Sequence, residues 1–125
     1  MAILTVENID DIADAQPTYV AATITTGDKF RNDDDNIAVW VKNVGIAKKM
    51  VIAYGRSSNF GTYKAKIVTI PTNVIKITQQ FTGWKFNDVD GYVSFYFTDT
   101  TGDADDPGAD DVTTVTIAAV RSRRY

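Results

Sequence analysis

Aspartates near the end of the chain form the segment best suited to metal chemistry. Residues 99–111 read Asp-Thr-Thr-Gly-Asp-Ala-Asp-Asp-Pro-Gly-Ala-Asp-Asp. Such a stretch offers many carboxylate oxygens, the ligands that Ca²⁺ prefers. The candidate ligands are Asp103, Asp105, Asp106 and Asp110. Because their spacing matches no complete EF-hand loop, we assign no metal and no cofactor, and keep calcium as the alternative to a solvated acidic loop.

A second acidic run, residues 32–36 (Asn-Asp-Asp-Asp-Asn), lies between two apolar segments. Asp and Asn suit a tight connection, because their side chains bond to nearby backbone and they tolerate left-handed conformations. A calcium site is a weaker alternative here, since the run has neither the glycine of the calcium turn nor a closing glutamate. We expect a tight acidic turn.

Catalytic residue types are scarce in this chain. Histidine and cysteine are both absent, which excludes a zinc site, thiol nucleophiles and histidine acid–base catalysis. An aspartate pair could still act as acid and base, but nearly all the aspartates fall in turn-like sequence. We therefore predict no enzymatic activity. Trp84, next to Gly83, is the aromatic residue that we expect to be exposed, and the other aromatic residues are more simply explained as core.

The apolar composition indicates an all-β fold. The chain has one leucine but 13 valines, 12 isoleucines and 16 threonines, and 15 of its 16 acidic residues are aspartates. Valine, isoleucine and threonine favour strands, aspartate favours turns, and the helix formers leucine and glutamate are almost absent. At 125 residues the chain is predicted to form one domain.

The strand-like segments recur with turn signals between them. Residues 37–43 and 50–54 are predicted to form a central hairpin of interior strands. Residues 63–70 and 74–80 alternate, which predicts strands with one solvent-facing, lysine-bearing face. We predict a single-domain antiparallel β-sandwich, jelly-roll-like, with about eight strands; an immunoglobulin-like sandwich or a barrel fits the same strands. Residues 1–16 are predicted to be an N-terminal arm, and residues 17–125 the sandwich.

The charged residues are segregated along the chain. The lysines in its middle are Lys42, Lys48, Lys49, Lys64, Lys66 and Lys76, whereas aspartates dominate residues 99–111. These groups fit either solvated surfaces or patches that complement another subunit. The net charge of −3 argues against a general attraction to nucleic acid. We expect no membrane segment and no secretory signal, since no long apolar run and no basic–apolar leader is present.

Three segments in matching order carry a resemblance to a known family. They are residues 17–23 with 27–30 and 32–33; residues 41–43 with Gly45; and residues 81–88 and 90–91 with the closing residues 115–121. Together they resemble the small head-decoration (capsid cement) proteins of tailed bacteriophages. Two features depart from that pattern. Asp34 and Asp35 replace a glycine-bearing turn, and residues 100–111 look like an insertion.

The resemblance implies a virion protein on the capsid surface that binds the major capsid protein and bridges its subunits, commonly as a homotrimer. It carries over no individual site residue. From the chain itself we take the apolar residues of the arm as candidate capsid contacts, namely Ile3, Leu4, Val6, Ile9 and Ile12. The alternatives are another virion component, such as a head-fibre base or a tail protein, and a carbohydrate-binding β-sandwich that uses Trp84.

Overall fold

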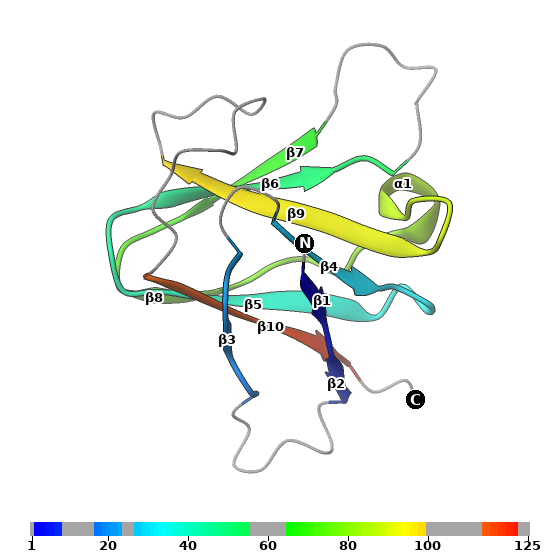
Figure 1. Cartoon of the computed structure of the whole chain (residues 1–125), viewed down its shortest axis with the longest axis horizontal. Coiled ribbons are helices and arrows are strands. Elements are labelled where there is room, and N and C mark those ends of the chain that lie inside the picture. Colours follow the sequence, from blue (N-terminus) through cyan, green and yellow to red (C-terminus); the bar gives the residue numbers. More distant parts are fainter. Residues whose placement is uncertain (1, 9–16, 24–26, 56–64, 100–113, 123–125) are drawn as a thin grey trace.

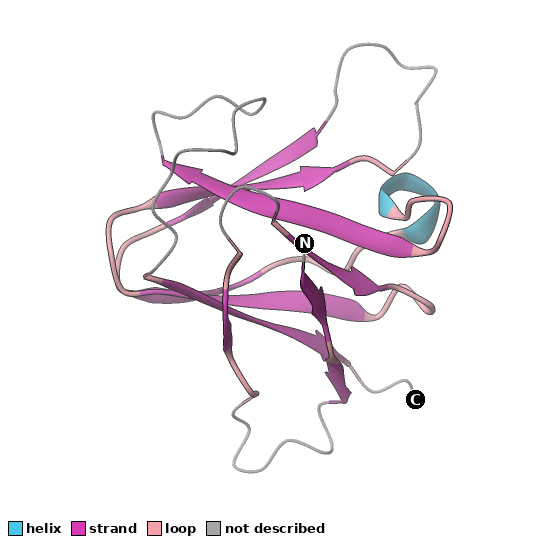
Figure 2. Ribbon diagram, viewed as in Figure 1, coloured by secondary structure: helices cyan, strands magenta, loops and turns pink. Residues whose placement is uncertain are grey.

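Ten β-strands, arranged as two sheets of five, dominate the part of the chain that the structure describes (Figures 1 and 2). The computed structural model describes residues 2–8, 17–23, 27–55, 65–99 and 114–122. The first sheet has the order β1 (Ala2–Leu4), β4 (Asp28–Arg31), β9 (Tyr92–Asp99), β6 (Lys48–Ala53), β7 (Ala65–Ile70). The second has the order β2 (Val6–Asn8), β10 (Val115–Arg121), β5 (Ile37–Asn43), β8 (Val74–Ile77), and β3 (Val20–Ala21) also pairs with β10. One short helix, α1 (Gly83–Phe86), lies between β8 and β9. The predicted all-β sandwich is confirmed.

Strands β3 to β10 follow the topology of a jelly roll. Only β6 and β7 are neighbours both in sequence and in one sheet, and every other connection among these strands passes to the opposite sheet. All pairs within this set are antiparallel. Eight strands in two four-stranded sheets with crossing connections define the double-sheet jelly roll. The prediction of about eight strands was too low, because the described residues contain ten.

The predicted central hairpin is wrong. β5 pairs with β10 and β8, whereas β6 pairs with β7 and β9 in the other sheet. Residues 44–47 form a corner between the sheets, held by Asn43: its Nδ2 donates to the Ile46 carbonyl (2.8 Å), and its Oδ1 accepts from the Gly45 N–H (3.0 Å). A short gap containing glycine suits a hairpin or a corner equally, and the polar anchor at Asn43 decides between them. Both strands are interior, as predicted.

The core lies between the inner faces of the sheets. Phe30 on β4 is fully buried, with its ring centroid 5.7 Å from that of Phe81 and 6.4 Å from that of Phe95. Phe81 also meets the ring of Phe86 edge-on, at 5.4 Å between centroids. Offset and edge-on arrangements are the favourable geometries for aromatic pairs. The aromatic residues thus form much of the core, which replaces the leucines that the chain lacks.

The described N-terminal residues belong to both sheets. β1 runs parallel to β4, and β2 runs parallel to β10, so the chain crosses from one sheet to the other at Thr5 (Figure 1). Leu4 lies opposite Phe30 and is buried, and Val6 packs against the core from the second sheet. This part of the predicted arm therefore closes one side of the sandwich, which we call the arm side.

Candidate interaction surfaces

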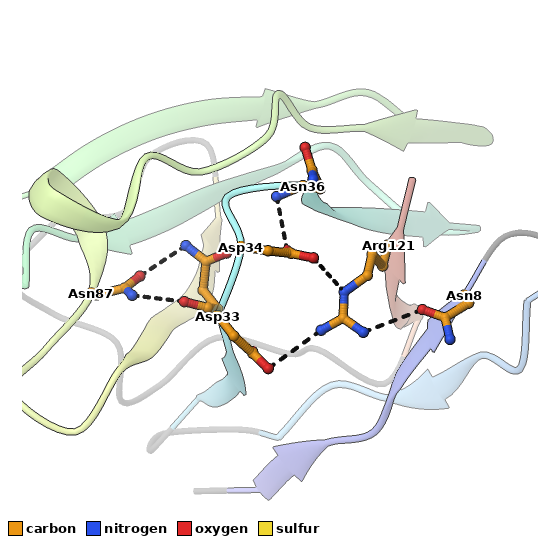
Figure 3. Close-up of polar contacts among 7 residues, drawn as sticks. Asn8, Asp33, Asp34, Asn36, Asn87 and Arg121 are labelled. Carbon is orange, nitrogen blue, oxygen red and sulfur yellow. Dashed lines mark hydrogen bonds and ion pairs between the residues drawn. The ribbon is translucent and has the colours of Figure 1, made fainter. Parts of the chain in front are cut away.

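The acidic turn at residues 32–36 is tied to the last described strand. Arg121, on β10, places its Nε 2.9 Å from Asp34 Oδ2 and its Nη2 3.6 Å from Asp33 Oδ2 (Figure 3). Its Nη1 donates to Asn8 Oδ1 at 3.2 Å. One guanidinium thus joins β10, the turn before β5 and the end of β2. The carboxylates of Asp33 and Asp34 therefore serve a structural ion-pair network.

Two asparagines link the same turn to helix α1 (Figure 3). Asn32 Nδ2 donates to Asn87 Oδ1 (2.8 Å) and to the carbonyl of Phe81 (3.0 Å), and Asn87 Nδ2 donates back to the Asn32 carbonyl (2.8 Å). Asp35, at φ 59°, accepts from the Gly83 N–H at the start of the helix (2.8 Å). The polar residues of the turn are thus bonded within the fold. Among the residues that the structure describes, no group of three or more acidic side chains is arranged to hold a metal.

The contacts of Arg121 with Asp33, Asp34 and Asn8 should contribute measurably to stability. We expect Arg121→Met to lower the free energy of unfolding by about 1 kcal/mol, because partly exposed ion pairs contribute little each and methionine keeps much of the apolar stem. Urea unfolding at low salt and at about 1 M salt checks this, since salt screens exposed charges. The deficit should shrink at high salt. A deficit that does not depend on salt would instead indicate lost packing.

The side opposite the arm is formed by the edge strands β7 and β8, and we call it the open side. There the predicted lysine-bearing face is exposed at Lys76, as expected, but it is the inner face of each strand and not the outer one. Lys66 pairs with Ile52 and Lys76 pairs with Val41, and both partners are buried in the core. Because paired residues point to the same side of a sheet, these lysines lie on the inner faces of their strands. Alternation separates the two faces of a strand but does not say which face is inside.

The outward faces of these edge strands are apolar. Ile75 and Ile77 on β8 are each 51% exposed, and Ile67 on β7 is 48% exposed. Ile77 lies opposite Trp40 on the outer face of the second sheet. Isolated exposed isoleucines are ordinary, and these lie on the outer faces of two different sheets, Ile67 on the first and Ile75 with Ile77 on the second.

A groove of about 160 Å³ opens on this side. Its apolar lining comes from Ile52, Val68, Phe81 and Phe86, and its charged lining from Lys66 and Lys85. Lys85 Nζ lies 5.3 Å from the ring centroid of Tyr54, a cation–π distance. Among the described residues, none that lines the groove is acidic. Its chemistry therefore favours an anionic group attached to an apolar stem.

The arm side carries a second and larger groove, of about 430 Å³, between β1–β2 and β3. Ile117, Ala118 and Ala119 of β10 are part of its lining, together with the exposed Ile3 and Val20. Of the candidate capsid contacts, Ile3 points outward and is 61% exposed, whereas Leu4 and Val6 are directed into the sandwich. Ile9 and Ile12 lie outside the described residues.

The remaining predicted site residues are not brought together. Trp84 is on helix α1 and is 71% exposed, whereas Phe86 on the same helix is buried. Asp103, Asp105, Asp106 and Asp110 lie outside the described residues. At Tyr19, burial raises the pKa of the hydroxyl above its ordinary value, and Lys42 Nζ lies 6.0 Å from the centroid of its ring.

Sequence reasoning missed both grooves. Each one is formed by segments far apart in the chain, such as residues 66–68 with 78–86, and only the crossing connections bring them together. In the described segments no helix is long and apolar enough to cross a membrane.

Comparison of the chain with protein-family models, with curated proteins and with solved structures found no match.

Proposed function

We propose that the protein is a non-enzymatic structural component of a phage virion, which binds the outer surface of the capsid and stabilises it by bridging major capsid subunits. The resemblance to capsid cement proteins, carried by residues 17–23, 27–33, 41–43, 81–91 and 115–121 without those between them, suggests this role, and a jelly roll is compatible with it. The described turn aspartates are bonded to Arg121 and to the helix α1 backbone, which fits a structural rather than a chemical use.

The observation that carries the proposal is the presence of contact surfaces on two opposite sides of one sandwich. The arm side offers the groove beside Ile3 and Val20, and the open side offers the exposed Ile75 and Ile77 and, separately, a lysine-lined groove. A protein that bridges two subunits needs two such surfaces, held at a fixed separation. Three interior strands in the first sheet and two in the second lie between the two sides and supply that rigidity.

We further propose that the protein acts as a homotrimer on the virion surface. Three copies held together would engage several equivalent capsid subunits at once, so weak single contacts would add up to tight binding. Light scattering after size-exclusion chromatography measures the oligomer directly. A mass near three times 13.8 kDa is expected; a stable dimer would contradict the trimer.

Cosedimentation with purified phage capsids that lack a decoration protein tests the main proposal. The protein should pellet with the capsids, saturate at a fixed ratio to the capsid subunits, and raise the temperature at which the capsids disassemble. Absence of saturable binding would overturn the proposal. Binding restricted to tails or fibres in purified particles would favour the alternative that the protein is another virion component.

Trp84 supports a second candidate function, carbohydrate binding. An exposed indole can stack on a sugar ring, and Trp84 is among the most exposed large apolar side chains of the described residues. A glycan array tests this directly. Specific binding that is lost in Trp84→Ala would support the carbohydrate-binding alternative, and an array without hits would discard it.

A further inference from the structure

The two sides of the sandwich end differently. On the arm side, one extended segment closes both sheets, since β1 pairs with β4 and β2 pairs with β10. On the open side, β7 and β8 are the last strands of their sheets within the described residues. An edge strand presents backbone N–H and C=O groups that can pair with another chain. The arm therefore shows how an edge of this sandwich is closed, and on the open side no described strand takes the equivalent position.

The backbone of β8 is oriented for such pairing. The Thr78 N–H, just after β8, donates to the Val39 carbonyl on β5 at 3.0 Å. In an antiparallel ladder, alternate residues direct their backbone groups toward the same neighbour. Residues 74 and 76 consequently point toward β5, and the N–H and C=O groups of Ile75 and Ile77 point to the open side. These two residues also carry the exposed apolar side chains.

Charge decides which kind of segment can pair there. Lys66 and Lys76 lie on the inner faces of the two edge strands, and Lys66 and Lys85 line the groove formed by β6, β7 and the residues that follow β8. Lysines placed on an edge strand prevent like chains from pairing. A second copy would bring its own Lys66 and Lys76 to the same edge, so self-association is opposed. A segment with carboxylates at alternate positions would instead meet opposite charges.

We propose that the open side binds an extended acidic segment of a major capsid subunit, which adds as a strand to β8 and places its carboxylates against Lys66, Lys76 and Lys85. Main-chain hydrogen bonds to Ile75 and Ile77 supply binding energy, and the lysines select acidic partners, as in other cases of strand addition. This inference rests on the proposed function, because it names the surface and the chemistry of the capsid contact.

Hydrogen–deuterium exchange of the protein bound to purified capsids tests the strand addition. The amides of residues 74–77 should exchange at least about tenfold more slowly on the capsid than in the free protein, because a tenfold change corresponds to roughly 1.4 kcal/mol of added protection. Capsid binding that leaves exchange in β8 unchanged would overturn the inference and leave the proposed function standing. If the protein does not bind capsids at all, both fail together.

Charge reversal tests the choice of partner. Lys66→Glu with Lys76→Glu should weaken capsid binding by about tenfold or more. The matched control, Arg31→Glu with Lys49→Glu, makes the same change of charge on the outer face of the first sheet and should bind nearly as the unchanged protein does. Equal losses in both variants would overturn the inference. If the first variant does not fold, the salt dependence of the unchanged protein decides, since binding that is independent of salt would contradict an acidic partner.

Discussion

Replacing Phe30 with alanine should lower the free energy of unfolding by about 3–5 kcal/mol, the range for removing a large aromatic side chain from a packed core. Phe30 is fully buried and lies against Phe81 and Phe95. It also lies opposite Leu4, which the N-terminal strand brings to the same inner face. Its loss would leave a cavity where three segments of the chain meet. Urea unfolding monitored by tryptophan fluorescence measures the effect.

Two variants serve as controls for the Phe30 experiment. Phe30→Leu keeps most of the buried volume and should cost considerably less than the alanine variant. Lys29→Ala alters the neighbouring outward position on β4 and should change stability by no more than about 1 kcal/mol, even though its Nζ lies 4.6 Å from the ring centroid of Tyr92. An alanine variant that loses less than about 1 kcal/mol would contradict the central position of Phe30.

Deletion of residues 1–8 should have the second large effect, a loss of about 3–5 kcal/mol or more. Leu4 alone has the burial for which truncation commonly costs 2–5 kcal/mol, and Val6 packs on the core as well. The deletion also exposes the edges of β4 and β10, which favours aggregation. For a domain with a total stability of about 5–15 kcal/mol, this could leave little folded protein. Thermal unfolding and light scattering of the truncated chain check both effects.

The truncation is a poor test of capsid contact, because it disturbs the fold and the surface together. Ile3→Asp is the sharper probe, since Ile3 faces outward and the change should leave stability within about 0.5 kcal/mol. If Ile3→Asp binds capsids as the unchanged protein does, Ile3 is not a capsid contact. An unchanged unfolding midpoint in the truncated chain would contradict the structural role of Leu4.

The composition of the chain was sufficient to predict an all-β sandwich, because the near absence of leucine and glutamate leaves few helix-forming segments. Strand pairing was harder to predict. Residues 37–43 and 48–53 look like a hairpin in sequence, and the bonds from Asn43 that turn the chain to the other sheet depend on the folded corner. A local sequence pattern shows that two strands follow each other along the chain, but it does not show whether they pair in the same sheet.

The candidate surfaces show the same limit. Alternation separated Lys66 from Ile67 and Lys76 from Ile75 and Ile77, but it did not show that these lysines share the inner face, where Ile70 also lies. On an interior strand a lysine at an inner position would be buried at high cost, so the usual expectation places lysine outside. On an edge strand the long stem carries the charge past the rim of the sheet, and this expectation fails. Whether a strand lies at the edge of a sheet depends on the topology, and the alternation of residues along that strand does not reveal it.

The pairing of β2 with β10 also constrains how the chain acquires its fold. Val6 lies opposite Ala119, and Asn8 lies opposite Arg121, so these residues find their partners only after more than a hundred further residues have been added. Contacts between such distant residues make folding slow, in the millisecond-to-second range typical of β-sandwiches. While the ribosome is still extending the chain, Leu4 and Val6 have no complete core to enter. Strand β2 must therefore wait for β10 before the sandwich can close.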